Sequence, residues 1–161
     1  MTDKSRDYDI IIIGAGLVGL SASLLMSRKI ENILVIDNKR EDSFHSLPES
    51  EDPYQGVKSI ALSLSSTKIF EALGIWKDIK KDAAIIENVH VSSKGDVGSV
   101  VLSASEIGEE VLGYNVANTI LYSSLYRKVK SAKIDFQYDS NLEGISCKKD
   151  HVEICFRVNN K

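Results

Sequence analysis

The order of apolar and polar positions near the N-terminus predicts a strand, a helix and a second strand. Tyr8–Ile13 is apolar at consecutive positions, as in a strand that is buried on both faces of a parallel sheet. Leu17–Ile30 has apolar residues at helical spacing, and Asn32–Ile36 is a short apolar strand that ends at Asp37. Together they form a minimal β-α-β unit, which predicts an α/β fold with a mostly parallel sheet.

A polar segment and a second helix follow this unit. Asn38–Gly56 is charged and contains both prolines, which predicts a long, mobile surface loop with a functional role. Ser59–Leu62 is a short strand candidate. Ser65 or Ser66 is expected to cap a helix that ends near Gly74.

The second half of the chain is rich in predicted strands. Ile85–Ser93 and Ser99–Leu102 flank the turn sequence Lys94–Gly98, which predicts a β-hairpin. Leu112–Asn118 fits neither pattern clearly, and Thr119–Val129 predicts an amphipathic helix. Three strand candidates close the chain: Ile134–Tyr138, Leu142–Cys147 and Val152–Val158.

A glycine-rich turn joins the first strand to the first helix. Gly14, Gly16 and Gly19 form a GxGxxG pattern: the first permits a tight turn, the second lets a pyrophosphate approach the backbone, and the third lets helix and strand pack closely. The helix N-terminus then offers N–H groups and a partial positive charge to the phosphates. The candidate phosphate-binding residues are therefore Gly14, Ala15, Gly16, Leu17 and Gly19.

Asp37 supplies the second part of this pattern. It stands 18 residues beyond Gly19, at the end of the second strand, where a carboxylate can accept hydrogen bonds from a ribose diol. A carboxylate there also disfavours a ribose 2′-phosphate, because two anions repel. The context predicts a Rossmann-like FAD/NAD(P)-binding fold. The loop alone does not distinguish FAD from NAD, since both contain an ADP half.

Composition and charge narrow the range of partners. The chain has 161 residues and a net charge of -3, without the basic excess of a nucleic-acid-binding protein. It has no run of eighteen apolar residues, and its polar N-terminus lacks the apolar segment of a signal peptide. These features predict a cytoplasmic domain with no nucleic-acid partner.

The sequence contains no metal-ligand pattern. Cys147 and Cys155 do not form a CxxC pair, and His45, His90 and His151 are scattered along the chain. We therefore expect no metal site, and we expect both cysteines to be reduced, partly buried thiols.

Three further blocks of sequence resemble one family. KSIALSLSSTKIFEALGIW (Lys58–Trp76), ENVHVSSKGDVGSVVL (Glu87–Leu102) and LGYNVANTILYSSL (Leu112–Leu125) are similar to ordered blocks of the FAD-dependent aromatic hydroxylases. This family is p-hydroxybenzoate-hydroxylase-like, and the branch that hydroxylates ubiquinone precursors is the one most similar here. With the glycine turn, the resemblance extends from Tyr8 to about Val158.

The resemblance implies a monooxygenase with a tightly held FAD, which uses NAD(P)H and O2 to hydroxylate an aromatic ring or quinone precursor. Gly14, Gly16, Gly19 and Asp37 would hold the ADP half of FAD. Lys58 stands where the family usually has a cofactor-binding arginine. The resemblance assigns no catalytic residue. A lipid-like substrate would be compatible with peripheral membrane or biosynthetic-complex association.

The chain departs from the family pattern in several places. Gly56 stands where the family usually has aspartate, Thr119 follows where it has arginine, and Tyr122 stands where it has glutamine. The later Asp-Gly and Gly-Asp motifs do not occur. We therefore interpret the chain as an N-terminal part of such an enzyme. Residues 1–80 would begin the FAD-binding domain, 81–112 would begin a β-rich substrate layer, and 113–161 would return to the FAD-binding domain.

Two alternatives remain. The chain could be a catalytically inactive FAD- or nucleotide-binding module that lacks the later flavin motifs. An NAD-dependent dehydrogenase would account for the glycine turn, but not for Lys58–Trp76 or the predicted hairpin.

Overall fold

The computed structural model describes residues 6–41, 58–95 and 97–159. The chain divides into two compact units, one made of Met1–Glu49 with Leu125–Lys161 and the other of Ser50–Ser124. The division at residues 80 and 112 stays a prediction, and most of the predicted loop Asn38–Gly56 lies outside the described residues.

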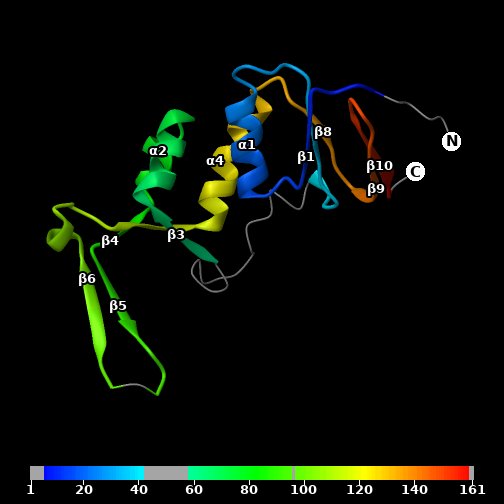
Figure 1. Cartoon of the computed structure of the whole chain (residues 1–161). Helices are drawn as coiled ribbons and strands as arrows, with labels where there is room; N and C mark the ends of the chain where they lie inside the picture. Colours follow the sequence, from blue (N-terminus) through cyan, green and yellow to red (C-terminus); the bar gives the residue numbers. More distant parts are fainter. Residues whose placement is uncertain (1–5, 42–57, 96, 160–161) are drawn as a thin grey trace, which may run out of the picture. The chain divides into compact units, whose positions relative to one another are not determined.

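The first unit is built on a parallel sheet. Its strands are β1 (Ile10–Ile13), β2 (Ile33–Ile36) and β8 (Asp135–Gln137), in the spatial order β1-β2-β8. Helix α1 (Leu17–Met26) connects β1 to β2 and packs against both strands (Figure 1). The predicted β-α-β start and the parallel pairing of its strands are confirmed.

The central strand of this sheet is β2, not β1. All four residues of β2 are buried, because β2 has a hydrogen-bonded strand on each side. In the described residues β1 pairs on one side only, and Ile13 is 47% exposed. The prediction that the first strand is buried on both faces is therefore wrong, although its apolar run is an equally good strand signal.

An antiparallel ribbon completes the first unit. Strands β9 (Ser140–Cys147) and β10 (Val152–Val158) pair with each other, with an irregularity between Cys155 and Phe156. Cys147 and Cys155 are free and exposed, not partly buried as predicted. A two-stranded ribbon gives its side chains little lateral cover, which strand propensity does not reveal.

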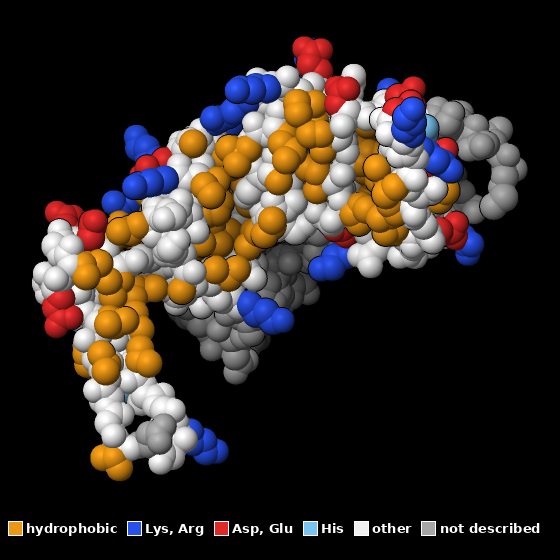
Figure 2. All heavy atoms as spheres, in the orientation of Figure 1, with side chains coloured by type: hydrophobic (Ala, Val, Ile, Leu, Met, Phe, Trp, Pro, Cys, Tyr) orange, Lys and Arg blue, Asp and Glu red, His pale blue; other side chains and the backbone are white. Residues whose placement is uncertain are grey.

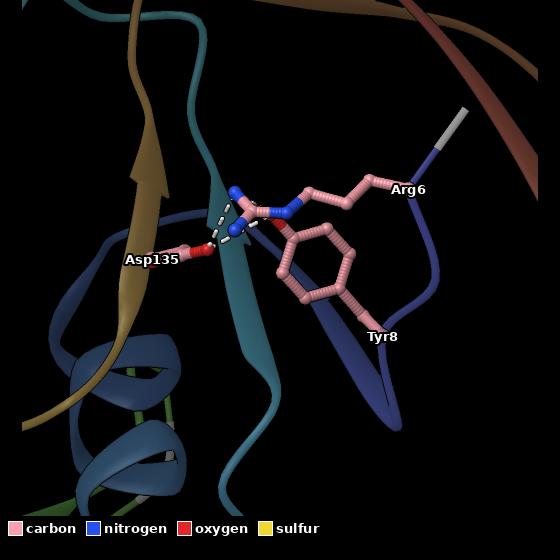
Figure 3. Close-up of polar contacts among 3 residues, drawn as sticks. All are labelled: Arg6, Tyr8 and Asp135. Carbon is pink, nitrogen blue, oxygen red and sulfur yellow. Dashed lines mark hydrogen bonds and ion pairs between the residues drawn. The ribbon is translucent and has the colours of Figure 1, made fainter. Parts of the chain in front are cut away.

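At the N-terminal end of the parallel strands, the Asp135 carboxylate at the start of β8 joins β8 to the segment that precedes β1. The Tyr8 hydroxyl donates to Asp135 Oδ2 over 3.0 Å, and Arg6 Nη1 lies 3.2 Å from the same oxygen (Figure 3). Burial, and then the hydrogen bond to Asp135, raise the pKa of Tyr8. The Tyr8 hydroxyl therefore stays protonated, and able to donate, to a higher pH than an ordinary tyrosine.

A second tyrosine–carboxylate cluster includes the last residues of helix α4 (Asn118–Lys130). The Tyr126 hydroxyl donates to Glu41 Oε1 over 2.5 Å, and the Lys130 ammonium also contacts that oxygen. Burial, and then this hydrogen bond, raise the pKa of Tyr126 from 10.0 to about 12. Burial, and then Tyr126, also raise the pKa of Tyr138.

The second unit contains a small antiparallel sheet. Strands β3 (Ser59–Ser63), β7 (Gly113–Ala117) and β4 (Ala84–Ile86) lie in the order β3-β7-β4. Helices α2 (Leu64–Ala72) and α3 (Trp76–Lys80) pack on each other, and α2 also packs on β3. The ambiguous segment 112–118 is thus mostly the central strand of this sheet.

Helix α2 begins earlier than predicted. Ser63 has extended backbone geometry, and its hydroxyl accepts a hydrogen bond from the Ser66 N–H over 3.2 Å. Ser63 is therefore the N-cap, and the predictions of Ser65 or Ser66 are wrong. Ser66 takes the complementary role of the third helical residue.

A β-hairpin forms the other sheet of this unit. Strands β5 (Asn88–Ser92) and β6 (Ser99–Ser103) pair antiparallel, and a short 3-10 helix, η2 (Ala104–Ile107), follows. The predicted hairpin is confirmed. The predicted strand Ile85–Ser93 is in fact two strands, β4 and β5, which belong to different sheets.

One face of the β5–β6 hairpin is apolar and exposed. Val89 is opposite Leu102 and Val91 is opposite Val100, so these four side chains share a face. They are 39–59% exposed, and Figure 2 shows hydrophobic atoms along this hairpin. Exposed apolar patches favour association.

We predict that the isolated chain self-associates through this face. The double substitution Val91→Thr/Val100→Thr should lower the weight-average mass measured by light scattering at high protein concentration. Val101→Thr, which changes the opposite face of β6, is the matched control. An equal drop in mass for the control would contradict this assignment.

We predict a specific loss of stability at alkaline pH. Because the folded pKa of Tyr126 is raised, its stabilising contribution is complete below about pH 10 and is lost as pH rises through about 12. Urea unfolding at several pH values should therefore show a smaller alkaline loss for Tyr126→Phe than for the wild type. Parallel losses in the two proteins would show that Tyr126 does not contribute.

Candidate functional site

The glycine turn starts at the C-terminal end of β1. The Gly14 N–H donates to the Ile36 carbonyl over 2.7 Å, which joins the turn to the end of β2. Gly14 has φ +106°, a conformation that favours glycine. Gly16 is the N-cap of α1, and its carbonyl accepts the first helical hydrogen bond, from the Leu20 N–H.

Gly19 allows the helix to approach the turn. A Cβ built on Gly19 would lie 1.9 Å from the Gly14 carbonyl oxygen and 3.1 Å from its carbon. Both atoms belong to the backbone and cannot move aside as a flexible side chain could. Only glycine therefore fits here, as the spacing of the motif predicts.

The space beside Gly16 is open. A Cβ built on Gly16 would meet no protein atom within 4 Å. Here the first turn of α1 begins, and it contains no acidic residue. Its N–H groups and the positive end of the helix dipole can therefore face an anion, which fits the pyrophosphate of a dinucleotide.

Asp37 lies directly beside this turn. Its Oδ2 accepts from the Ala15 N–H over 2.6 Å, and its Oδ1 accepts from the Lys39 N–H over 2.8 Å. Its backbone N–H donates to the Gln137 carbonyl, and its carbonyl accepts from the Ser140 N–H, both over 3.0 Å. The side chain is thus fixed against the turn, and the backbone is fixed against the β8–β9 connection.

The geometry suits an ADP group. Each carboxylate oxygen has two lone pairs, so the two backbone contacts leave Asp37 able to accept further hydrogen bonds from a diol. The turn supplies N–H donors for phosphate within the same unit. The structure therefore brings together the predicted residues Gly14, Ala15, Gly16, Leu17, Gly19 and Asp37.

Lys58 belongs to the second unit. It is exposed, and its carbonyl accepts from the Asn118 N–H over 2.8 Å, which joins the start of β3 to the start of α4. Asn118 Oδ1 is buried and has no hydrogen-bond partner in the described part of the chain. Thr119 and Tyr122 lie on α4. A cofactor role for Lys58 stays a prediction, and Gly56 is outside the described residues.

The sequence does not predict two backbone contacts of the site. The Lys39 N–H donates to Asp37 Oδ1, and the Asp139 N–H donates to the Lys39 carbonyl over 3.0 Å. Asp139 has φ 52°, a left-handed conformation that aspartate tolerates better than most residues. The short polar sequence between β8 and β9 could have indicated a turn, but not its contact with Lys39.

The described residues contain neither a candidate metal site nor a candidate membrane-spanning helix. No group of three or more His, Cys, Asp or Glu side chains there could hold a metal ion. None of the described helices is long and apolar enough to cross a membrane.

Comparison with known proteins assigns the family. The chain belongs to the FAD binding domain family, which matches residues 7–160, and FAD is the cofactor of this family. Two curated relatives are a hydroxylase and a monooxygenase. The 3-demethoxyubiquinol 3-hydroxylase of Escherichia coli is 24% identical over 79% of this chain and 31% of its own length. The mitochondrial ubiquinone biosynthesis monooxygenase of Dictyostelium discoideum is 25% identical over 80% of this chain and 28% of its own length.

These relatives confirm the resemblance, and the chain spans less than a third of their length. Solved structures support the fold. The p-nitrophenol 4-monooxygenase PnpA of Pseudomonas putida has a TM-score of 0.67 at 12% identity, covering 94% of this chain and 36% of its own. PqsL of Pseudomonas aeruginosa, solved with 2-aminobenzoylacetate, has a TM-score of 0.67 at 14% identity, covering 94% and 39%.

We predict that substitution by alanine destabilises the protein much more at Gly19 than at Gly16. Gly19→Ala should lower the free energy of unfolding by about 1–3 kcal/mol or prevent folding, because its Cβ would overlap a backbone oxygen. Gly16→Ala should cost at most about 1 kcal/mol, since its Cβ would enter open space at an N-cap. Urea unfolding followed by circular dichroism measures both. Equal losses would contradict the close approach at Gly19.

Proposed function

We propose that this chain holds the ADP half of FAD in an NAD(P)H-dependent monooxygenase that hydroxylates an aromatic ring, specifically a ubiquinone precursor. The observation on which the proposal depends is the contact between Asp37 Oδ2 and the Ala15 N–H. This contact joins the carboxylate that would bind the ribose to the turn that would bind the phosphates, and so it supports the proposal. The ring-hydroxylating relatives support the reaction class.

The chain's own groups bind and orient the nucleotide. The N–H groups at the start of α1 would receive the pyrophosphate, and Gly16 would leave room for it. Asp37 would accept hydrogen bonds from the ribose hydroxyls of the adenosine part. When bound, FAD would supply the electron transfer and oxygen activation that no protein side chain provides.

The proposed substrate class is taken from the reactions of two relatives. One hydroxylates demethoxyubiquinol and another acts in ubiquinone biosynthesis, so a substituted, electron-rich ring is the proposed substrate class. The described residues suggest no catalytic acid or base. The proposed role of this chain is therefore cofactor binding within the enzyme, and Lys58 is proposed as an additional cofactor contact.

A nucleotide-binding module without redox activity is the second candidate. It is favoured by the observation that the assembled site accounts only for the ADP half of the cofactor. This candidate predicts that ADP and FAD bind with similar affinity and that NAD(P)H oxidation does not follow.

The proposal is tested by nucleotide binding to the purified chain. ADP and FAD are titrated by calorimetry, and the visible flavin spectrum is recorded after desalting. We expect Gly16→Val to weaken ADP binding at least about tenfold, equivalent to about 1.4 kcal/mol, because its side chain would occupy the proposed phosphate position.

Gly16→Ala is the size comparison, because its methyl group projects into the same space but is smaller, and we expect it to weaken ADP binding less than Gly16→Val does. Circular dichroism must show that both variants fold. Wild-type protein that binds neither ADP nor FAD would contradict the proposal. FAD binding with NADH- or NADPH-dependent flavin reduction would favour the monooxygenase over the binding module.

A further inference from the structure

The segment that follows β2 is attached to the rest of its unit at two successive points. At the first, the Lys39 N–H donates to Asp37 Oδ1, and the Lys39 carbonyl accepts from the Asp139 N–H. Lys39 therefore connects the orientation of the Asp37 carboxylate to the turn after β8. Displacement of the Lys39 N–H would remove one of the two backbone donors that orient the Asp37 carboxylate.

The second attachment point is Glu41. Its carboxylate accepts from the Tyr126 hydroxyl over 2.5 Å and also contacts the Lys130 ammonium. Lys130 lies over the Tyr126 ring, with its Nζ 5.2 Å from the centroid, and Tyr138 is part of the same cluster. We call Glu41, Tyr126 and Lys130 the Glu41 latch.

Of the two contacts that Glu41 makes in the latch, the hydrogen bond from Tyr126 is stronger than the ion pair with Lys130. Its side chain is buried, at 4% exposure, and a neutral donor to a carboxylate makes a strong hydrogen bond. Lys130 and Glu41 are each about half exposed, and ion pairs of that kind contribute little. Removing the Tyr126 hydroxyl should therefore release Glu41 more than removing the Lys130 charge would.

We infer that Glu41 and Tyr126 are positioning residues, which hold the segment after β2 so that Asp37 stays aligned with the glycine turn. This inference rests on the proposed nucleotide-binding function. Neither residue needs to touch the nucleotide. Their effect on affinity comes from pre-organisation, because a carboxylate that is already oriented loses less conformational freedom when a ligand binds.

Tyr126→Phe tests this inference, with Tyr8→Phe as its matched control. Both substitutions remove one hydroxyl that donates to a carboxylate in the same unit, but Tyr8 bonds to Asp135 at the other edge of the sheet. Amide hydrogen exchange is measured by NMR at Ala15 and Lys39, the two donors to Asp37. We expect exchange at both amides to be roughly fivefold faster in Tyr126→Phe and nearly unchanged in Tyr8→Phe.

ADP binding is the second measurement. Tyr126→Phe should raise the dissociation constant of ADP roughly three- to tenfold, while Tyr8→Phe should leave it within about twofold. Glu41→Ala, at an exposed position, should reproduce the Tyr126→Phe effect even if the latter folds poorly. The double variant Glu41→Ala/Tyr126→Phe should bind ADP no more weakly than either single variant, because both substitutions remove the same contact.

Equal exchange rates at Ala15 and Lys39 in Tyr126→Phe and Tyr8→Phe would overturn the inference, as would an unchanged ADP affinity in both Tyr126→Phe and Glu41→Ala. Absence of ADP binding by the wild-type chain would instead overturn the proposed function. The exchange comparison needs no nucleotide, so it decides the role of the latch in either case.

Discussion

The closeness of helix α1 to the turn before it is the constraint on which the first unit depends. Gly19 has no side chain, and a Cβ there would lie 1.9 Å from the Gly14 carbonyl oxygen. Because the helix starts so close to the sheet, the Ala15 N–H can reach Asp37 at the end of β2. The first two strands and the helix are thereby joined at the same edge that would hold a dinucleotide.

Strand β2 connects the glycine turn and Asp37 to the rest of the unit. It is hydrogen-bonded to β1 on one side and β8 on the other, and the backbone of Asp37 continues this pairing toward Gln137 and Ser140. The candidate site thus depends on residues that are separated by about a hundred positions in the sequence. Asp37 is held from three directions, by the glycine turn, by its own following turn and by the β8–β9 connection.

The parts of the site that were predictable are those in which a local residue type has a single physical reason. Gly14 requires a positive φ, Gly19 requires the absence of a Cβ, and Asp37 comes directly after an apolar strand. Each reason can be recognised from a short stretch of sequence. Other predictions failed because they depended on neighbours. The exposure of Ile13 reflects how many strands flank β1, and the exposure of Cys147 reflects the two-stranded ribbon. The N-cap at Ser63 depends on where β3 ends.

The sequence by itself determined the β-α-β start, the candidate phosphate and ribose residues, and the resemblance to FAD-dependent hydroxylases, because these depend on short-range spacing. Only the tertiary structure decided which strand is central and that Tyr126 bonds to Glu41. It also showed that Asp139 supports the backbone after Asp37. Such contacts join residues far apart in the chain, and each depends on how strands and helices pack once they have formed. A polar residue such as Glu41 has no local pattern that distinguishes a buried tyrosine partner from water.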